Sequence, residues 1–363
     1  MDCPSVEPIK DSVLIVHLGA LGAVVRSTSL LAAVRRHYPQ SHITWVTQAP
    51  ADQLLRNHPW IDRVLSTSAA DQLILKALKF DVGLVIDKSL SAVALAESVQ
   101  VDHYFGFTAH PKTGAILPAN ILAEELWSLG LDNHKKFFVN EKPETQLQAE
   151  ALGLTPFQRD EYQLPLTSSE AELARLRAAQ WRIDPQLPVI GMNTGCSQMI
   201  PYKKLTVDYH RRLISKLLSA GYKNLVLLGG AEDAERNQAI GLGLPVFQSP
   251  TAAGLRDGLT SVAACDLVLT GDSLGMHLAI SQKKFVAVWF GPTCAQEIDL
   301  YGRGRKILSK ATCAPCWKSL CANTQMCYDQ VAIKEWIDAV VEGHQFWQKE
   351  FSSYKQHFLE TSF

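Results

Sequence analysis

The chain repeats one local pattern, in which a short apolar run leads through a glycine-bearing turn into an amphipathic helix. The first copy has an apolar run over residues 13–18, a turn over 19–22 and a predicted helix over 24–37. Apolar runs without polar alternation indicate strands buried on both faces, and strands that alternate with helices are typical of parallel sheets. The pattern therefore predicts an α/β fold. Later runs that predict strands span residues 43–47, 82–86, 188–192, 225–228, 266–269 and 285–290.

The pattern is interrupted near the middle of the chain, where polar residues and prolines dominate residues 140–187. Such a stretch favours a domain boundary. At roughly 150 residues per domain, a chain of this length also indicates about two domains. We expect Rossmann-like domains over residues 1–165 and 166–340. Residues 331–363 are predicted to be helical, and we expect the C-terminal helix over 341–363 to pack back on the protein, with a helix that lies on a membrane surface as the alternative. The expected contact face of that helix carries Trp347, Phe351, Tyr354 and Phe358 at helical spacing.

Charge and hydropathy exclude several classes of protein. The 35 basic and 36 acidic residues give a net charge of -1, which argues against nucleic acid as a partner. The most apolar early stretch, residues 13–25, lacks a preceding basic region and is too short to span a bilayer. We therefore expect a cytoplasmic protein.

The first turn carries two glycines, Gly19 and Gly22, at the end of the first predicted strand. Glycines there let a ligand approach the backbone and bring an anion near a helix N-terminus. The same residues also fit a tight strand-to-helix turn. Their spacing is not G-x-G-x-x-G, so a nicotinamide dinucleotide is disfavoured.

Loops after three later strands carry further candidate ligand groups. Thr194 and Gly195, followed by Lys203, suit a diphosphate because hydroxyl, amide and ammonium groups bond or neutralise its oxygens. A solvated loop with a surface lysine explains them equally. Glu232 follows another strand and can accept hydrogen bonds from ribose hydroxyls, although a helix dipole also favours an acid there.

The last of these loops contains Asp272 and Ser273, which are typical helix N-cap residues, with His277 one turn further on. A lone histidine at such a position is often structural. The sequence has no Asp-x-Asp motif, so a metal clamp on that motif is not expected.

In order and spacing, these stretches resemble glycosyltransferase family 9, the ADP-heptose:lipopolysaccharide heptosyltransferases. The resemblance covers most of the chain and includes an aspartate-flanked strand from Asp81 to Asp87. It implies a GT-B fold with two facing Rossmann-like domains, of which the second binds most of the donor. The motifs that carry it are VLIVHLGALGAVVRSTSLLAAVRRHYP, ITWVT, GMNTG, LLGGAE, DSLGMHLA and WFGPT.

The resemblance also implies a reaction and a set of donor-binding residues. The reaction is the inverting, metal-independent transfer of heptose, or a related sugar, from an ADP-sugar to a lipid A-core oligosaccharide. No cofactor is required, and the acceptor would bring the protein into peripheral contact with the inner face of the cytoplasmic membrane. The implied donor-binding residues are Gly19, Gly22, Thr194, Gly195, Lys203, Glu232, Asp272, Ser273 and His277.

Two positions depart from the family pattern. Ala23 stands where the family has an aspartate proposed as the catalytic base, and Leu274 stands where it has a glycine, with Gly275 following. General-base assistance is worth about 10²–10⁴-fold in rate, so a substitute is needed for an active enzyme. His17 is one candidate, although it is equally explained as a packed histidine. The alternatives are a nucleotide-sugar-binding protein without transferase activity, or a transferase that uses another nucleotide sugar.

Four cysteines, Cys313, Cys316, Cys321 and Cys327, lie within fifteen residues of one another. Four thiolates at such spacing suit a structural zinc ion or an iron–sulfur cluster. Two disulfides, which a reducing cytoplasm disfavours, and a metal-free loop are the competing interpretations.

Overall fold

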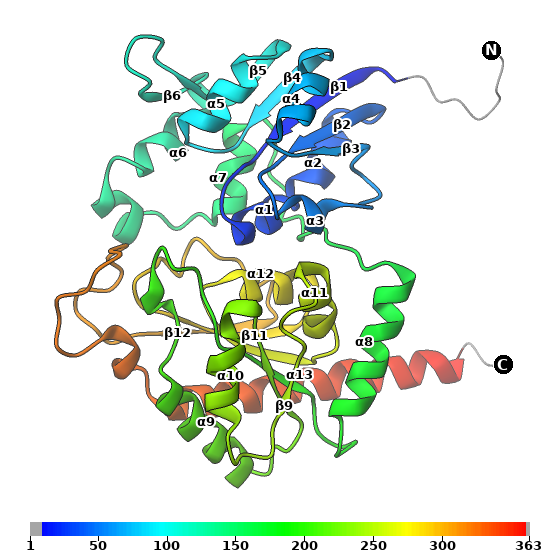
Figure 1. Cartoon of the computed structure of the whole chain (residues 1–363), viewed down its shortest axis with the longest axis vertical. Coiled ribbons are helices and arrows are strands. Elements are labelled where there is room, and N and C mark those ends of the chain that lie inside the picture. Colours follow the sequence, from blue (N-terminus) through cyan, green and yellow to red (C-terminus); the bar gives the residue numbers. More distant parts are fainter. Residues whose placement is uncertain (1–8, 361–363) are drawn as a thin grey trace. The chain divides into compact units, whose positions relative to one another are not determined.

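The computed structural model describes the backbone of residues 9–360 and the side chains of residues 9–350. The chain divides into two compact units (Figure 1). The first comprises Met1–Pro165 together with Gln296–Asp299, and the second comprises Leu166–Ala295 and Leu300–Phe363.

The sheet of the first unit has the strand order β3-β2-β1-β4-β5-β6. Its strands are parallel except for β6, which pairs antiparallel with β5. The parallel sheet that we expected is thus extended by one hairpin, which needs only a short connection. The strands are β1 (Asp11–Val16), β2 (Ser41–Val46), β3 (Arg63–Leu65), β4 (Lys79–Val85), β5 (Gln100–Ala109) and β6 (Ile116–Pro118).

Helices cover both faces of this sheet because successive side chains of a strand point to opposite faces. Along β1, Val13 and Ile15 belong to one buried cluster, whereas Leu14 and Val16 belong to another. The helices of the unit are α1 (Leu21–Ser27), α2 (Leu30–His37), α3 (Asp52–Leu55), α4 (Ala69–Lys76), α5 (Leu90–Glu97), α6 (Glu124–Leu129) and α7 (Glu144–Ala151).

The prediction of one helix over residues 24–37 is wrong in one respect: the structure has two helices there, α1 and α2. The hydroxyls of Thr28 and Ser29 donate to the carbonyls of Val25 and Arg26, three residues earlier. Side chains that bond the nearby backbone in this way compete with helix continuation.

The segment Gln296–Asp299 returns to the first unit, although we had assigned it to the domain over 166–340. Polar contacts explain its position. Glu297 accepts a backbone hydrogen bond from Glu144 at 2.9 Å and lies 3.3 Å from Lys136 Nζ. Asp299 pairs with Arg159. No apolar pattern in the sequence indicates that these four residues belong to the first unit, so we did not predict it.

The second unit repeats the strand order of the first, since β12-β11-β10-β7-β8-β9 is the same sequence of connections read from the other edge. All its strand pairs are parallel. The strands are β7 (Ile190–Asn193), β8 (Leu225–Leu228), β9 (Phe247–Gln248), β10 (Leu267–Gly271), β11 (Phe285–Phe290) and β12 (Gly304–Leu308).

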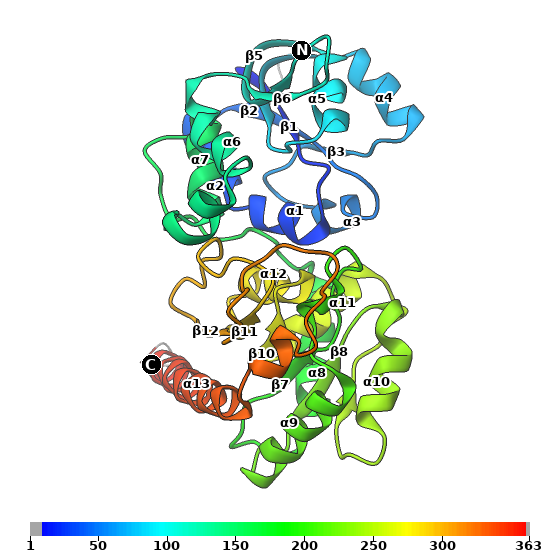
Figure 2. The same ribbon diagram turned by 90° about the vertical axis from the view of Figure 1, so that its left-hand side faces the viewer.

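Helices also cover both faces of the second sheet. α9 and α13 contribute to one apolar cluster, and Figure 2 shows them on the same side of the sheet, with α11 and α12 on the other. The helices are α8 (Ser168–Trp181), α9 (Val207–Ser219), α10 (Ala234–Gly241), α11 (Leu255–Ala263), α12 (Leu274–Ser281) and α13 (Ile333–Glu360).

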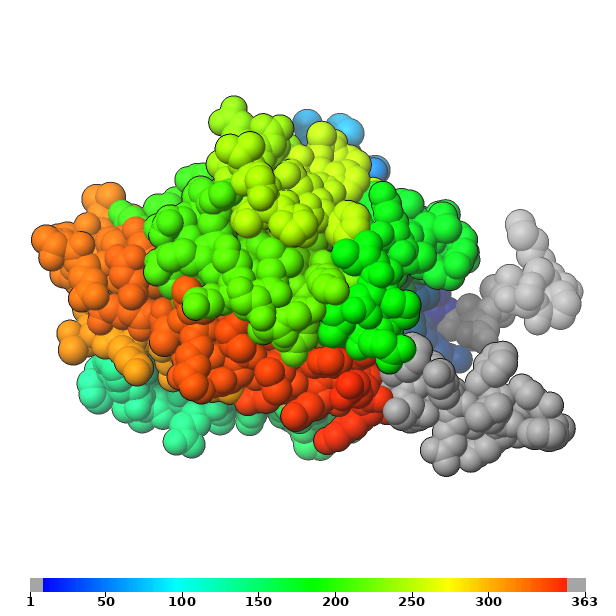
Figure 3. Space-filling model, turned by 90° about the horizontal axis from the view of Figure 1, so that it is seen from below, coloured from blue at the N-terminus to red at the C-terminus, as the bar shows by residue number. Residues whose placement is uncertain are grey.

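The C-terminal helix α13 is continuous from Ile333, so the boundary that we placed after residue 340 falls inside a helix. Trp336, Ala339 and Val340 are buried in the core of the second unit, and Trp347 packs against that core. Figure 3 shows α13 in red along the surface of this unit. The side chains of Phe351, Tyr354 and Phe358 lie outside the described residues.

Each sheet has one point at which neighbouring strands are followed by connections that run in opposite directions. In the first unit this switch point lies between β1 and β4, and in the second between β7 and β10. Ligands of open α/β sheets bind at the carboxyl ends of the strands that flank a switch point. Ligands are therefore expected at the loops after β1, β4, β7 and β10.

Candidate active site

At the switch point of the first unit, the loops after β1 and β4 bring His17 and Asp87 together. His17 Nε2 lies 3.4 Å from Asp87 Oδ1. The other carboxylate oxygen, Oδ2, accepts hydrogen bonds from the backbone N–H groups of Leu18 and Gly19, the latter at 3.0 Å. The carboxylate is therefore held in one orientation, with Oδ1 toward the histidine.

The other side of the His17 ring is fixed by Ser27 of α1. His17 Nδ1 is hydrogen bonded to Ser27 Oγ, and that hydroxyl lies 2.7 Å from the carbonyl oxygen of Ala23, to which it donates. Ala23 thus contributes a backbone acceptor where the resembled family has an acidic side chain. Gly22, which we expected in a loop, lies in α1.

Burial shifts the pKa values of His17 and Asp87 in opposite directions. Burial, followed by the positive charge of Arg26, lowers the pKa of His17 to about 3. Burial raises the pKa of Asp87 to about 6, although its two backbone donors act in the other direction. A buried histidine with so low a pKa is a weak base and is hardly accessible to a substrate, so the structure argues against His17 acting alone.

At the switch point of the second unit, Lys203 and Asp272 approach each other from the loops after β7 and β10. Lys203 Nζ lies 3.7 Å from Asp272 Oδ2, and both side chains are largely buried. The backbone is also close here, since a Cβ on Gly271 would lie 1.9 Å from the carbonyl oxygen of Lys203. Two of the predicted site residues are therefore neighbours in space, although 69 positions separate them in sequence.

Asn193, at the end of β7, connects these two loops and was not among the predicted site residues. Its Nδ2 atom donates to the carbonyl of Gly195 at 3.0 Å, to Thr270 Oγ1 at 3.2 Å and to Ser273 Oγ at 3.0 Å. Ser273 is the N-cap residue of α12, as expected, but its side chain bonds this network instead of capping the helix. The sequence feature that could have identified it is the asparagine of the GMNTG motif.

The loop after β7 places Thr194 differently from our expectation. Its hydroxyl is buried and donates to Asn237 Oδ1 at 2.6 Å, so it is not presented to a diphosphate. Gly195 lies close to Asp233: a Cβ there would be 2.1 Å from an Asp233 carboxylate oxygen, so a larger residue would displace that side chain. Glu232, by contrast, is exposed after β8, where a ribose could reach it.

The departure at Leu274 is accommodated by the next residue. A Cβ on Gly275 would lie 2.5 Å from the Asn193 side chain, so Gly275 lets α12 approach that network. His277 is buried within α12 and only 5% exposed. It therefore belongs to the packed base of the site, and we retain a ligand role for it only as a prediction.

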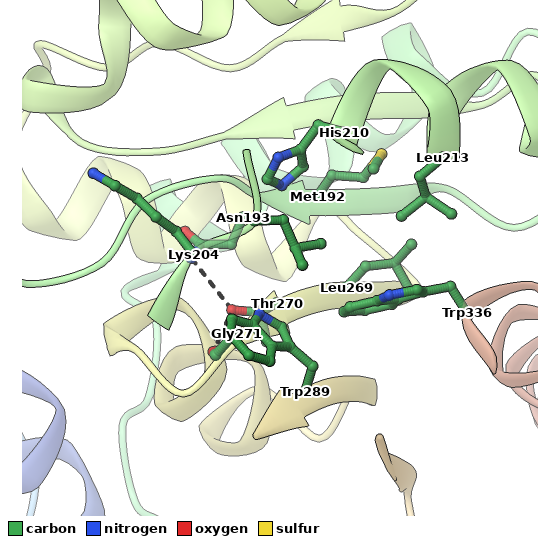
Figure 4. A pocket seen from close by; sticks show the side chains of 11 residues that line it. Met192, Asn193, Lys204, His210, Leu213, Leu269, Thr270, Gly271, Trp289 and Trp336 are labelled. Carbon is green, nitrogen blue, oxygen red and sulfur yellow. Dashed lines mark hydrogen bonds between the residues drawn. The ribbon is translucent and has the colours of Figure 1, made fainter. Parts of the chain in front are cut away.

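A small pocket extends from this site toward the core of the second unit (Figure 4). One side is polar and the deeper side is apolar. In Figure 4 the ammonium group of Lys204 points away from the other labelled side chains. The lining residues are Met192, Asn193, Lys204, Leu205, His210, Leu213, Leu269, Thr270, Gly271, Trp289 and Trp336.

The four clustered cysteines are free thiols, so the structure does not contain the two disulfides considered above. Burial is the main cause that raises the pKa of Cys327 to about 11, and the charges of Cys316, Cys321 and Cys313 add to it. The four thiols are therefore near enough to influence one another. However, no three His, Cys, Asp or Glu side chains within the described part of the chain are arranged to hold a metal ion. Zinc or an iron–sulfur cluster in this loop therefore remains a prediction, which elemental analysis of anaerobically purified protein with thiol titration would test.

Two Rossmann-like units in one chain, each with polar side chains at its switch point, are the architecture of GT-B glycosyltransferases. A sequence model of glycosyltransferase family 9 (heptosyltransferase) matches residues 73–327, and the chain belongs to this family. It is 22% identical over 305 residues to lipopolysaccharide heptosyltransferase 2 of Salmonella typhimurium, covering 77% of this chain and 83% of that protein. The corresponding protein of Escherichia coli is 20% identical over 302 residues, with the same shares covered.

Solved structures show the same fold. A family 9 glycosyltransferase of Veillonella parvula has a TM-score of 0.73 at 18% identity, covering 93% of this chain and 98% of that one. E. coli ADP-heptose LPS heptosyltransferase II has a TM-score of 0.64 at 18% identity, covering 92% and 99%. The iron-containing dodecameric glycosyltransferase TibC of E. coli has a TM-score of 0.53 at 12% identity, covering 93% and 77%.

No helix in the described residues combines the length and apolar character that crossing a bilayer requires.

Proposed function

We propose that the protein transfers heptose, or a closely related sugar, from an ADP-sugar to a hydroxyl of the lipopolysaccharide core, with inversion and without a catalytic metal ion. The observation that carries this proposal is the Lys203–Asp272 pair beside Asn193 at the second switch point. A lysine ammonium there can neutralise a diphosphate as a point charge. The relatives named above act in lipopolysaccharide heptose transfer, which supports this donor and acceptor.

Within this proposal, Lys203 binds the donor diphosphate and the exposed Glu232 binds the ribose. Asp272, Ser273 and His277 line the nucleotide and sugar position, as the family resemblance implies. The acceptor is lipid-linked, so we also propose transient contact with the inner face of the cytoplasmic membrane.

Donor binding and turnover can be measured separately. We expect calorimetry to show binding of ADP and of ADP-heptose, and we expect ADP release only when a heptose-free lipopolysaccharide core is added. The rate should be unchanged in EDTA, and NMR of the product should show the anomeric configuration opposite to that of the donor. Binding of ADP-heptose without ADP release would instead favour the nucleotide-sugar-binding protein, and turnover with another nucleotide sugar would revise the donor.

A further inference from the structure

The first switch point contains a connected set of side chains that the proposed donor site does not use, which we call the Ser27–His17–Asp87 chain. Resting on the proposed transfer reaction, we propose that Asp87 takes the proton from the acceptor hydroxyl and that His17 and Ser27 hold the carboxylate and its proton in position. Asp87 would thus perform the task that Ala23 cannot. Asp87 would be the catalytic residue, and the other two would be positioning residues.

Hydrogen-bond geometry determines which nitrogen of His17 carries a proton. A carbonyl oxygen can only accept, so the Ser27 hydroxyl, 2.7 Å from the carbonyl oxygen of Ala23, donates to it. Ser27 Oγ must then accept from His17 Nδ1–H. Because the buried His17 is neutral, its Nε2 presents a lone pair toward Asp87 Oδ1, 3.4 Å away.

This arrangement leaves the Asp87–His17 pair ready to accept one proton. A proton that arrives on Asp87 Oδ1 is directed at the Nε2 lone pair, whereas Oδ2 remains on its two backbone donors. The pKa of Asp87, raised to about 6 by burial, lies closer to neutral pH than that of an ordinary aspartate. A general base is most effective when its pKa lies near the working pH.

Gly19 lies against the pair without crowding it. A Cβ at this position would lie 2.8 Å from Asp87 Oδ1 and 3.1 Å from His17 Nε2. Asp87 is 12% exposed, whereas His17 is 4% exposed, so the carboxylate is the member of the pair that solvent or substrate can reach.

In the step that we propose, the acceptor oxygen forms a bond to the anomeric carbon of the donor sugar. The bond between that carbon and the β-phosphate oxygen breaks, and its electron pair leaves with ADP. The hydroxyl proton passes to Asp87 Oδ1 and is later released to water.

The neighbouring charges have partners of their own. Arg26, on α1, pairs with Glu144 of α7 at 2.7 Å. Lys88, which follows Asp87 in the same loop, donates to the carbonyl of Leu126 at 3.0 Å.

Since the ionised carboxylate of Asp87 is the active form, kcat/KM should rise with pH through about 6 and then level off.

Asp87→Asn tests the proposal directly. Asparagine keeps an oxygen for the two backbone donors but cannot take the proton, so we expect kcat to fall about 10²–10⁴-fold. The Kd for ADP and the thermal unfolding midpoint should match those of the wild type. Asp81→Asn is the matched control, because Asp81 accepts from Ser12 at the opposite end of β4, and it should retain the wild-type kcat.

Ser27→Ala tests the positioning role through the pH profile. Without the serine, His17 can carry its proton on Nε2 and donate it to Asp87, which stabilises the carboxylate. The acid limb of kcat/KM should therefore move to lower pH, a shift that a purely structural role of Ser27 would not cause. An unmoved acid limb would contradict the positioning role.

The outcomes separate this inference from the proposed function. A wild type that transfers sugar, together with an Asp87→Asn variant that transfers equally well, overturns the inference alone. A wild type that releases no ADP with any nucleotide sugar overturns the proposed function and this inference with it.

Discussion

Replacing Lys203 with glutamine should weaken ADP binding and lower kcat/KM for sugar transfer by at least about a hundredfold, which is the effect typical of losing one preorganised electrostatic group. Lys203 and Asp272 are 17% and 15% exposed, so water screens their charges only partly. Without the ammonium, the Asp272 carboxylate is left uncompensated where the donor diphosphate would bind. The loss of attraction and the new repulsion therefore act in the same direction.

A double variant distinguishes these two contributions. Adding Asp272→Asn to Lys203→Gln removes the repulsion, so part of the lost ADP affinity should return in calorimetry. Lys216→Gln, on the exposed face of α9, removes the same charge elsewhere and should bind ADP as the wild type does. If Lys203→Gln alone kept wild-type affinity for ADP, the donor site would have to lie elsewhere.

The strands that the sequence predicted best are those buried on both faces. β11 was expected over residues 285–290, and the structure places it at Phe285–Phe290, with every residue buried. β5 was not expected, because exposed and half-buried residues interrupt its apolar ones. β3, β9 and β12 also escaped prediction, since short or charged strands near a sheet edge carry little apolar signal.

The candidate site shows a similar division. Lys203 and Asp272 were predicted from their loops, and the strand order explains why they meet, because β7 and β10 are neighbours. Asp87 was visible in the sequence only as one end of an aspartate-flanked strand. The role proposed for it depends on β4 lying beside β1, with Val85 opposite Val16. The sequence alone does not show which strands are neighbours, so it did not single out Asp87.

Thr194 illustrates the limit of assigning roles by residue type. A hydroxyl in a loop after a strand suits a phosphate, but the same hydroxyl suits any buried acceptor that the fold brings near. Asn237, on α10, lies 43 positions away in sequence and provides that acceptor. Secondary structure alone could not have shown which of the two partners the threonine takes.

Replacing Trp336 with alanine should lower the free energy of unfolding of the second unit by about 3–5 kcal/mol, the usual cost of removing a large buried aromatic side chain. Trp336 is 1% exposed and packs from α13 into a core that includes Trp289 and Tyr209. It also lines the pocket together with Leu205, which lies two residues after Lys203. The cavity left by alanine would therefore open onto a pocket that Lys204 and Leu205 also line, next in sequence to Lys203, the lysine proposed to bind the donor.

Urea unfolding followed by circular dichroism would measure this effect, with two further variants as references. Trp336→Phe keeps most of the buried area and should lose clearly less stability than Trp336→Ala. Val341→Ala, on the same helix but 42% exposed, should change the free energy by no more than about 0.5 kcal/mol. Equal urea midpoints for Trp336→Ala and the wild type would mean that α13 contributes little to this core. Because Trp336 lines the same pocket as Lys204 and Leu205, which follow Lys203, loss of stability in Trp336→Ala should be accompanied by weaker ADP binding even where the variant remains folded.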